Sequence, residues 1–490
     1  MPKKTTFLIF FVTISIYLAY LVNGLTFISM SPDSFRFISI AQNNIDNGNG
    51  ILSNLFHYFK DASSYDMHRG RHVQYLMYLL DILTNNFMPL PFANYIVTIV
   101  LLINAYLIGD LIKLNFVHKF KYWVPIVIAL LFFTSCFSFS PIILLILYGK
   151  IIWITFILAF FYTKKKILKI AFLIIASFCD EFGLFSVLLI IYFRSLKLVF
   201  ESPLDNINYS LRLLIPICLS VICLLSFYGF NAILFNHGGS SLISFASTQT
   251  KLISSTSITE IPKYLGWGLQ EILLGHIENQ YIDYFLGFGF IFILLFAFHK
   301  KVMVKYVLKI RRNNIKDLIE LLSKDSKLQI YLFWLLIFLF INFIAIPGGG
   351  YNDVSHYSYA RYSTLFIIFI YSVFELINSK RKELMFISSI GLCAFIHVLT
   401  FINTLKFTEN QNDQYIYPDQ TVNKLEIAAV YTKAYETRKN KIINPEFKKD
   451  TLNLEFSGTW YYSKQKNYDI KKHSHFPING MYKVLIWPLK

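Results

Sequence analysis

Residues 167–193 read ILKIAFLIIASFCDEFGLFSVLLIIYF. The stretch is long enough for one membrane crossing, which takes about 20 apolar residues, but Asp180 and Glu181 interrupt it near its centre. Lysines precede the stretch, and Arg194 and Lys197 follow it. Because basic residues collect on the cytoplasmic side of membrane proteins, we predict that both ends lie there. The stretch would then be a re-entrant pair of half-helices with the acidic residues at its tip; a single span is the alternative.

Similar apolar stretches recur along the chain and indicate its fold class. The 490 residues are 55% hydrophobic and 15% charged, whereas soluble domains carry about 25% charged residues. We therefore expect an all-α polytopic membrane protein with about 9–11 membrane helices, the re-entrant pair included. The other apolar runs are 7–28, 92–112, 122–139, 141–162, 212–235, 281–298, 330–346, 362–377 and 385–402.

The basic links between these runs predict which segments face outward. Lys3 and Lys4 place the N-terminus in the cytoplasm. The net charge of +17 fits cytoplasmic loops and anionic lipid surfaces, so a nucleic-acid partner is not expected. The segments expected outside are 31–90, 237–280, 347–361 and 404–490.

The composition changes toward the C-terminal end of the chain. Long apolar runs stop, and Lys, Asn, Asp and Glu become frequent. Residues 420–436 have a helical pattern, while 452–456 and 482–487 alternate roughly as strands do. We therefore predict two domains, a transmembrane domain at 1–403 and a small α+β outer domain at 404–490.

Asp33 directly follows the first apolar run, within Met30-Ser-Pro-Asp-Ser-Phe-Arg-Phe37. A carboxylate at the membrane edge can act as a general base, which takes the proton of a hydroxyl as its oxygen attacks an anomeric carbon. An aspartate between proline and an amphipathic helix is also a good N-cap. Catalysis and capping are the two interpretations of this residue.

Arg69, Arg71 and His72 form a basic cluster later in the same segment. The guanidinium fork of arginine fits phosphate or pyrophosphate. Binding to anionic lipid headgroups is the alternative, but positive charge is normally kept inside. An outer cluster therefore favours phosphate binding.

The acidic pair in the opening stretch is costly at membrane depth. Asp180 and Glu181 lie between apolar segments, and such residues face a cavity or a partner. Lys150 lies within another apolar run and is a candidate partner for one of them. The pair would thus either form a buried ion pair or contact a substrate.

A second candidate phosphate site follows the triglycine at 348–350. His356, Arg361 and Tyr362 lead into the next apolar run. Arg361 would bind phosphate, with His356 as an acid or hydrogen-bond donor. An interfacial, snorkelling arginine is the alternative.

With an acidic residue after the first helix and Gly70–Arg71 later in the loop, the chain resembles the type C glycosyltransferase superfamily. It is also similar to bacterial membrane proteins of the glucosyl-transfer type that modify surface polysaccharide. The resemblance covers about 1–400 as architecture and implies a polytopic enzyme that takes a sugar from a polyprenyl-phosphate carrier. Many members carry paired acidic residues in this loop, whereas Asp33 lies between a proline and a serine, so the resemblance does not carry over a metal.

These features predict a hexosyltransferase of the bacterial plasma membrane, active on its outer face. Arg69, Arg71 or Arg361 would hold the carrier phosphate while Asp33 activates a surface glycan or lipid acceptor. The alternatives are a polysaccharide repeat-unit polymerase or ligase, and a transporter or flippase of lipid-linked sugars with the acidic pair along its path. We expect no cofactor and no metal; the partners would be the polyprenyl-linked donor, the acceptor and membrane lipids.

Overall fold

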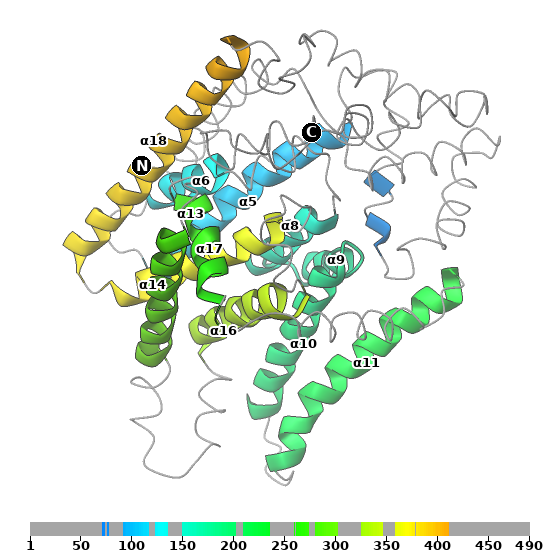
Figure 1. Cartoon of the computed structure of the whole chain (residues 1–490). Helices are drawn as coiled ribbons and strands as arrows, with labels where there is room; N and C mark the ends of the chain where they lie inside the picture. The colour runs from blue at the N-terminus through cyan, green and yellow to red at the C-terminus, as the bar shows by residue number, and fades with distance from the viewer. Residues whose placement is uncertain are drawn as a thin grey trace, which may run out of the picture.

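The computed structural model is built almost entirely of helices in the parts of the chain that it describes (Figure 1). The prediction of a helical protein is confirmed over these residues. The described residues are 71–73, 76–77, 92–116, 123–135, 149–201, 209–235, 259, 261–273, 280–301, 325–345, 358–377 and 379–410.

Every described helix except α13 overlaps one of the predicted apolar runs. The helices are α5 (Phe92–Phe116), α6 (Trp123–Thr134), α8 (Gly149–Tyr162), α9 (Lys166–Ser177), α10 (Glu181–Glu201), α11 (Tyr209–Phe235), α13 (Ile261–Leu273), α14 (Gln280–Phe298), α16 (Ser326–Leu339) with a π-helical turn η5 (Phe340–Ala345), α17 (Ser358–Leu376) and α18 (Lys380–Asn410).

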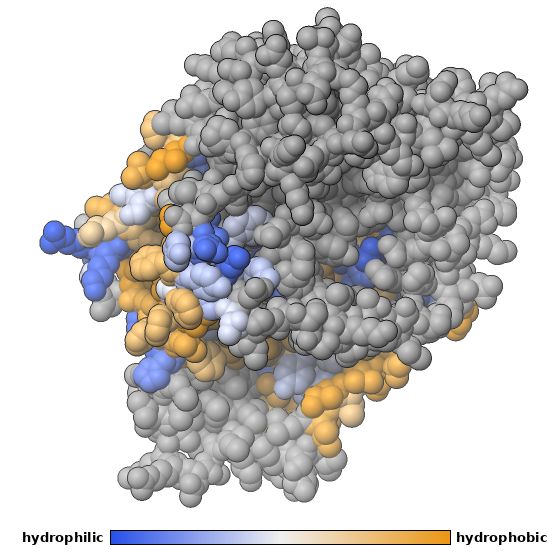
Figure 2. Space-filling view, viewed as in Figure 1, coloured by the Kyte–Doolittle hydropathy of each residue, from blue (hydrophilic) through white to orange (hydrophobic). Residues whose placement is uncertain are grey.

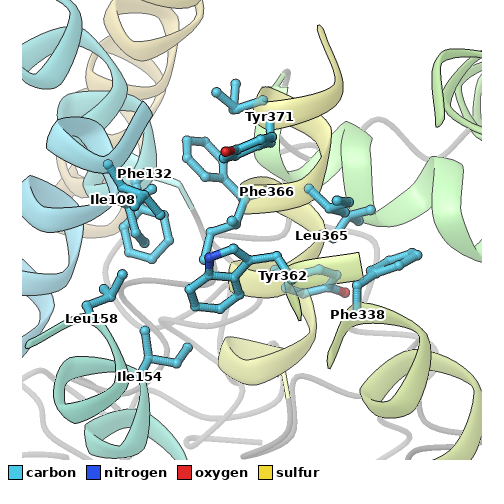
Figure 3. Packing of buried hydrophobic residues seen from close by; sticks show 14 of the residues in the cluster. Ile108, Phe132, Ile154, Leu158, Phe338, Tyr362, Leu365, Phe366 and Tyr371 are labelled. Carbon is cyan, nitrogen blue, oxygen red and sulfur yellow. The ribbon is translucent and has the colours of Figure 1, made fainter. Parts of the chain in front are cut away.

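Helix α17 forms the centre of the packed bundle. It contacts α5, α8, α13, α14 and α16, and Tyr359, Phe366 and Tyr371 on it are fully buried. Figure 3 shows Phe366 and Tyr362 of α17 among apolar side chains of α5, α6, α8 and α16. Phe366 packs edge-on against Phe132 of α6, with ring centroids 5.2 Å apart, in the range that favours aromatic pairs.

Helices α13 and α14 form a very close antiparallel pair. A Cβ on Gly266 would lie 1.5 Å from the carbonyl oxygen of Asp283, and one on Gly287 would lie 1.6 Å from that of Pro262. Only glycine allows two helix backbones to approach this closely. The two glycines therefore fix how α13 lies along α14.

Three described helical segments are long and apolar enough to cross a membrane: Glu181–Phe200, Leu214–Asn231 and Gln280–Lys301. Only 17% of the window on α11 is buried inside the protein, and Figure 2 shows apolar side chains over α11 at the lower right. On α14, Phe285 is 77% exposed. Such outward apolar side chains suit contact with lipid.

Two features differ from the sequence predictions. Residues 237–280 were expected to be an outer loop, but they contain α13, which is packed against α14 and α17. Helix α18 continues to Asn410, past the predicted domain boundary at residue 404. Most of the predicted C-terminal α+β domain lies outside the described residues.

Candidate functional site

The helix break inside the opening stretch lies where the acidic pair predicts it. Helix α9 ends at Ser177 and α10 begins at Glu181. The Asp180 carboxylate accepts a hydrogen bond from the Phe182 N–H at 3.2 Å, and thus caps α10. Glu181 occupies the first turn of α10, where the helix dipole favours a negative charge. The acidic pair therefore stabilises the start of α10.

The two helices fold back on one another at this break. A Cβ on Gly183 would lie 2.0 Å from the carbonyl oxygen of Ala176, so only glycine fits the turn. Toward the other end, Lys169 Nζ of α9 lies 5.4 Å and Arg194 Cζ of α10 lies 5.8 Å from the ring centroid of Phe160. The end of the α9–α10 pair away from the break therefore contains both Lys169 and Arg194, and we call it the basic end.

Arg71 reaches the break from a segment far away in the sequence. Its Nε donates to Glu181 Oε2 at 3.0 Å, and its Nη2 lies 2.9 Å from Oε1 and 2.8 Å from Oε2. Its Nε also lies 3.4 Å from Asp180 Oδ2. The side chains are 3% exposed for Arg71, 0% for Asp180 and 11% for Glu181. Such burial is tolerated because the charges are paired with good geometry.

His72 extends the contact to α11. Asn231 donates its amide Nδ2–H to the Phe227 carbonyl at 2.8 Å, so its Oδ1 is the acceptor that faces His72 Nε2 at 2.5 Å. This arrangement requires a hydrogen on Nε2 of His72. Both side chains are buried, and the pair joins the segment of Arg71 to α11.

The backbone next to His72 is held at the same place. The Val73 N–H donates to the Phe178 carbonyl at 3.1 Å, and the Phe178 ring lies 5.2 Å from the ring of His72. Phe178 also packs against Phe227 of α11, with centroids 5.2 Å apart. Three consecutive residues, 71–73, are therefore bound to the helix break and to α11.

We call Arg71, His72, Asp180, Glu181 and Asn231 the Arg71 cluster. It unites four of the predicted site residues and adds Asn231, which the sequence analysis missed. The sequence does contain a clue to Asn231, because it is a polar residue inside a long apolar run and such residues often make functional or packing contacts. The carboxylates bond to an arginine that the sequence analysis assigned to phosphate.

Arg361 and Tyr362 lie in the first turns of the central helix α17. Arg361 is 2% exposed, and Tyr362 packs edge-on against Trp267 of α13 at 6.1 Å. Beside them, the hydroxyl oxygen of Tyr359 accepts a hydrogen bond from Asn104 of α5 at 2.9 Å. This second polar region joins α17 to α5 and α13.

The remaining candidates are not described. Asp33, Arg69 and His356 lie outside the described residues, and so does the side chain of Lys150. In the described part of the chain, no group of three or more His, Cys, Asp or Glu residues has the geometry of a metal site. Comparisons with protein-family models, with curated proteins and with solved structures find no match for this chain.

Proposed function

We propose that the protein is an integral-membrane glycosyltransferase that moves a sugar from a polyprenyl-phosphate carrier to a surface glycan or lipid acceptor. In this proposal it lies in a bacterial plasma membrane with its site on the outer face, and α9 and α10 form a re-entrant pair. The observation that carries the proposal is the anchoring of residues 71–73 to the helix break and to α11.

This anchoring supports an enzyme because transfer between two bound substrates depends mainly on position. Fixed orientation of reacting groups can supply a large share of a rate enhancement. The anchored residues belong to the segment between the first apolar run and α5, which also contains Asp33. Because this segment is fixed at Arg71 and His72, the positions that the Asp33 carboxylate can reach are limited.

The reaction itself needs no redox chemistry. The acceptor hydroxyl oxygen bonds to the anomeric carbon, and the bond from that carbon to the phosphate oxygen breaks. The hydroxyl proton goes to the carboxylate of Asp33, and the electron pair of the broken bond leaves with the carrier phosphate. In this scheme Arg69 stabilises the phosphate charge, while Arg71, held by two carboxylates, orients the loop.

The same contacts weigh against the transporter alternative. In the transporter alternative the acidic pair lines the path, where its carboxylates would have to be available to the substrate. Here Glu181 is held by three contacts of 3.0 Å or less to Arg71, and the break is also fixed through Val73 and Phe178. A repeat-unit polymerase or ligase would use the same arginines and differs only in its donor and acceptor.

The proposal is tested by comparing surface glycans from cells with and without the gene. We expect the loss of one sugar substituent, measured by mass spectrometry of the released glycans, and its return when the wild-type gene is restored. Membrane vesicles that contain the protein should also transfer labelled sugar from a polyprenyl-phosphate donor. Unchanged glycans together with inactive vesicles would refute a transferase.

A further inference from the structure

Two cationic side chains converge on one aromatic ring at the basic end of the α9–α10 pair. Lys169 Nζ lies 5.4 Å and Arg194 Cζ lies 5.8 Å from the ring centroid of Phe160 on α8. Both distances are within the range of cation–π attraction. Two positive charges that share one ring repel each other, so the ring alone does not balance them.

Among the described residues, no carboxylate forms an ion pair with Lys169 or Arg194. The first turn of α9 contains no acidic residue, and its N-cap position is Lys165, which makes no side-chain capping bond. Lys164 and Lys166 beside it are exposed. Positive charge is therefore concentrated at this end of the hairpin, and no described acidic side chain neutralises it.

Exposed apolar side chains lie on the same helices. Ile167, Ile170 and Ile174 are 81%, 58% and 53% exposed, and their spacing puts them along one side of α9. On α10, Leu198 is 68% exposed and lies one helical turn beyond Arg194. Lys169 itself lies on the opposite, packed side of α9, whereas Lys166 lies one turn before Ile170 and Arg194 one turn before Leu198. An exposed cation beside an aliphatic side chain fits the boundary between lipid headgroups and acyl chains.

We infer that Lys169 and Arg194 bind the phosphate of an acidic phospholipid, with the lysines 164–166 adding to the attraction and Leu198, one turn from Arg194, beside its acyl chains. Arg194 is exposed and Lys169 is half-buried, so a headgroup can reach both. A free phosphate ion would match the charges but would leave the exposed Leu198 beside Arg194 uncovered. The combination of charge and apolar surface favours the lipid.

The test uses the full-length protein in mild detergent and counts bound lipid by native mass spectrometry. The probes are phosphatidylglycerol, zwitterionic phosphatidylcholine and inorganic phosphate. The test variant is Lys169→Gln/Arg194→Gln. Its matched control is Lys380→Gln/Arg381→Gln, which removes two exposed charges from the first turn of α18.

We expect wild type and control to retain phosphatidylglycerol in preference to phosphatidylcholine. Since each cationic contact at a membrane surface contributes a similar increment, loss of two corresponds to about 30-fold weaker binding by the test variant. A variant that exchanges the two residues, Lys169→Arg/Arg194→Lys, keeps both charges and should bind as wild type. If the glutamine variant does not elute as a folded protein, the exchange variant provides the test instead.

Three results would overturn the inference: wild-type binding by the glutamine variant, equal binding of phosphatidylcholine, or displacement of the lipid by inorganic phosphate at a similar concentration. Loss of binding by the exchange variant alongside normal elution would overturn it as well. The readout is bound lipid and not transferred sugar, so the inference stands or falls separately from the glycosyltransferase proposal.

Discussion

Arg71 and Glu181, 110 residues apart in sequence, form a bidentate ion pair with Nη2–Oε1 at 2.9 Å and Nε–Oε2 at 3.0 Å. The pair is almost completely buried. It connects the segment before α5 to the first turn of α10. The stability of the helix break and the position of that segment therefore depend on the same two side chains.

Replacing Arg71 with methionine should strongly destabilise the protein. Asp180 and Glu181 would remain buried without their cation, and breaking one side of a buried pair costs about 3–5 kcal/mol. Thermal unfolding in detergent measures this as a lower midpoint. The control Arg381→Met removes an exposed arginine and should change the midpoint little. A midpoint for Arg71→Met equal to that of the control would contradict the pairing.

Asn231→Leu tests the contact between His72 and α11. The variant keeps side-chain size but removes the acceptor of the His72 Nε2–H, and an unmatched buried donor costs about 1–3 kcal/mol. Unfolding should occur at lower temperature than in Cys218→Ala, a change at an exposed position of the same helix. Equal midpoints for the two variants would mean that the contact contributes nothing to stability.

Gly266→Ala should disrupt the α13–α14 pair. The new Cβ would lie 1.5 Å from the carbonyl oxygen of Asp283, so the helices must separate. Gly289→Ala is the matched control, because no atom lies within 4 Å of its Cβ position, and alanine in a helix is favoured by about 0.5–1 kcal/mol. We expect a large loss of thermal stability for Gly266→Ala and none for Gly289→Ala; the reverse order would refute the packing.

Cysteine labelling tests the side of the membrane on which α9 and α10 end. In a protein without its native cysteines, Lys165→Cys probes the N-cap of α9, and Ser202→Cys probes the residue that follows α10 in the sequence. An impermeant thiol reagent should label both in inside-out vesicles and neither in intact cells. Labelling of only one of them from outside would make the stretch a single span and would reverse the predicted sidedness of the later helices.

Asp33→Asn tests the proposed base. Asparagine keeps the size and capping ability of aspartate but cannot accept the proton, so transfer should fall about 10²–10⁴-fold at normal expression. Asp66→Asn, in the same segment, should keep wild-type activity. Vesicle assays with a labelled polyprenyl-phosphate sugar provide the measurement. Wild-type transfer by Asp33→Asn would remove this residue from the mechanism.

The sequence was sufficient to locate the helix break but not its partners. Two carboxylates inside an apolar run, with basic residues at both ends, indicate a turn at Asp180. This signal lies entirely within one short stretch of the sequence. The identity of the cation is not local. Arg71 and Asn231 join the carboxylates and His72 across long stretches of chain, and no periodic pattern encodes such a contact.

Helix α13 was missed for a different reason. Leu265, Leu269 and Ile272 are buried at helical spacing, which is a usable signal. Gly266 and Gly268 obscured it, because glycine normally weakens a helix. The structure gives the glycines a packing role, since Gly266 contacts the backbone of α14 and Gly268 faces Tyr362 and Leu365 of α17.

The central position of α17 has a consequence for the order in which the protein matures. Every helix described as packing around it, from α5 to α16, is synthesised earlier, and chains begin to fold during synthesis. Until residue 358 emerges, Asn104 lacks the Tyr359 hydroxyl and Phe132 lacks the ring of Phe366. A chain that ends before α17 would leave the helices made first with an unfilled centre, so completion of the bundle waits for one of its last helices.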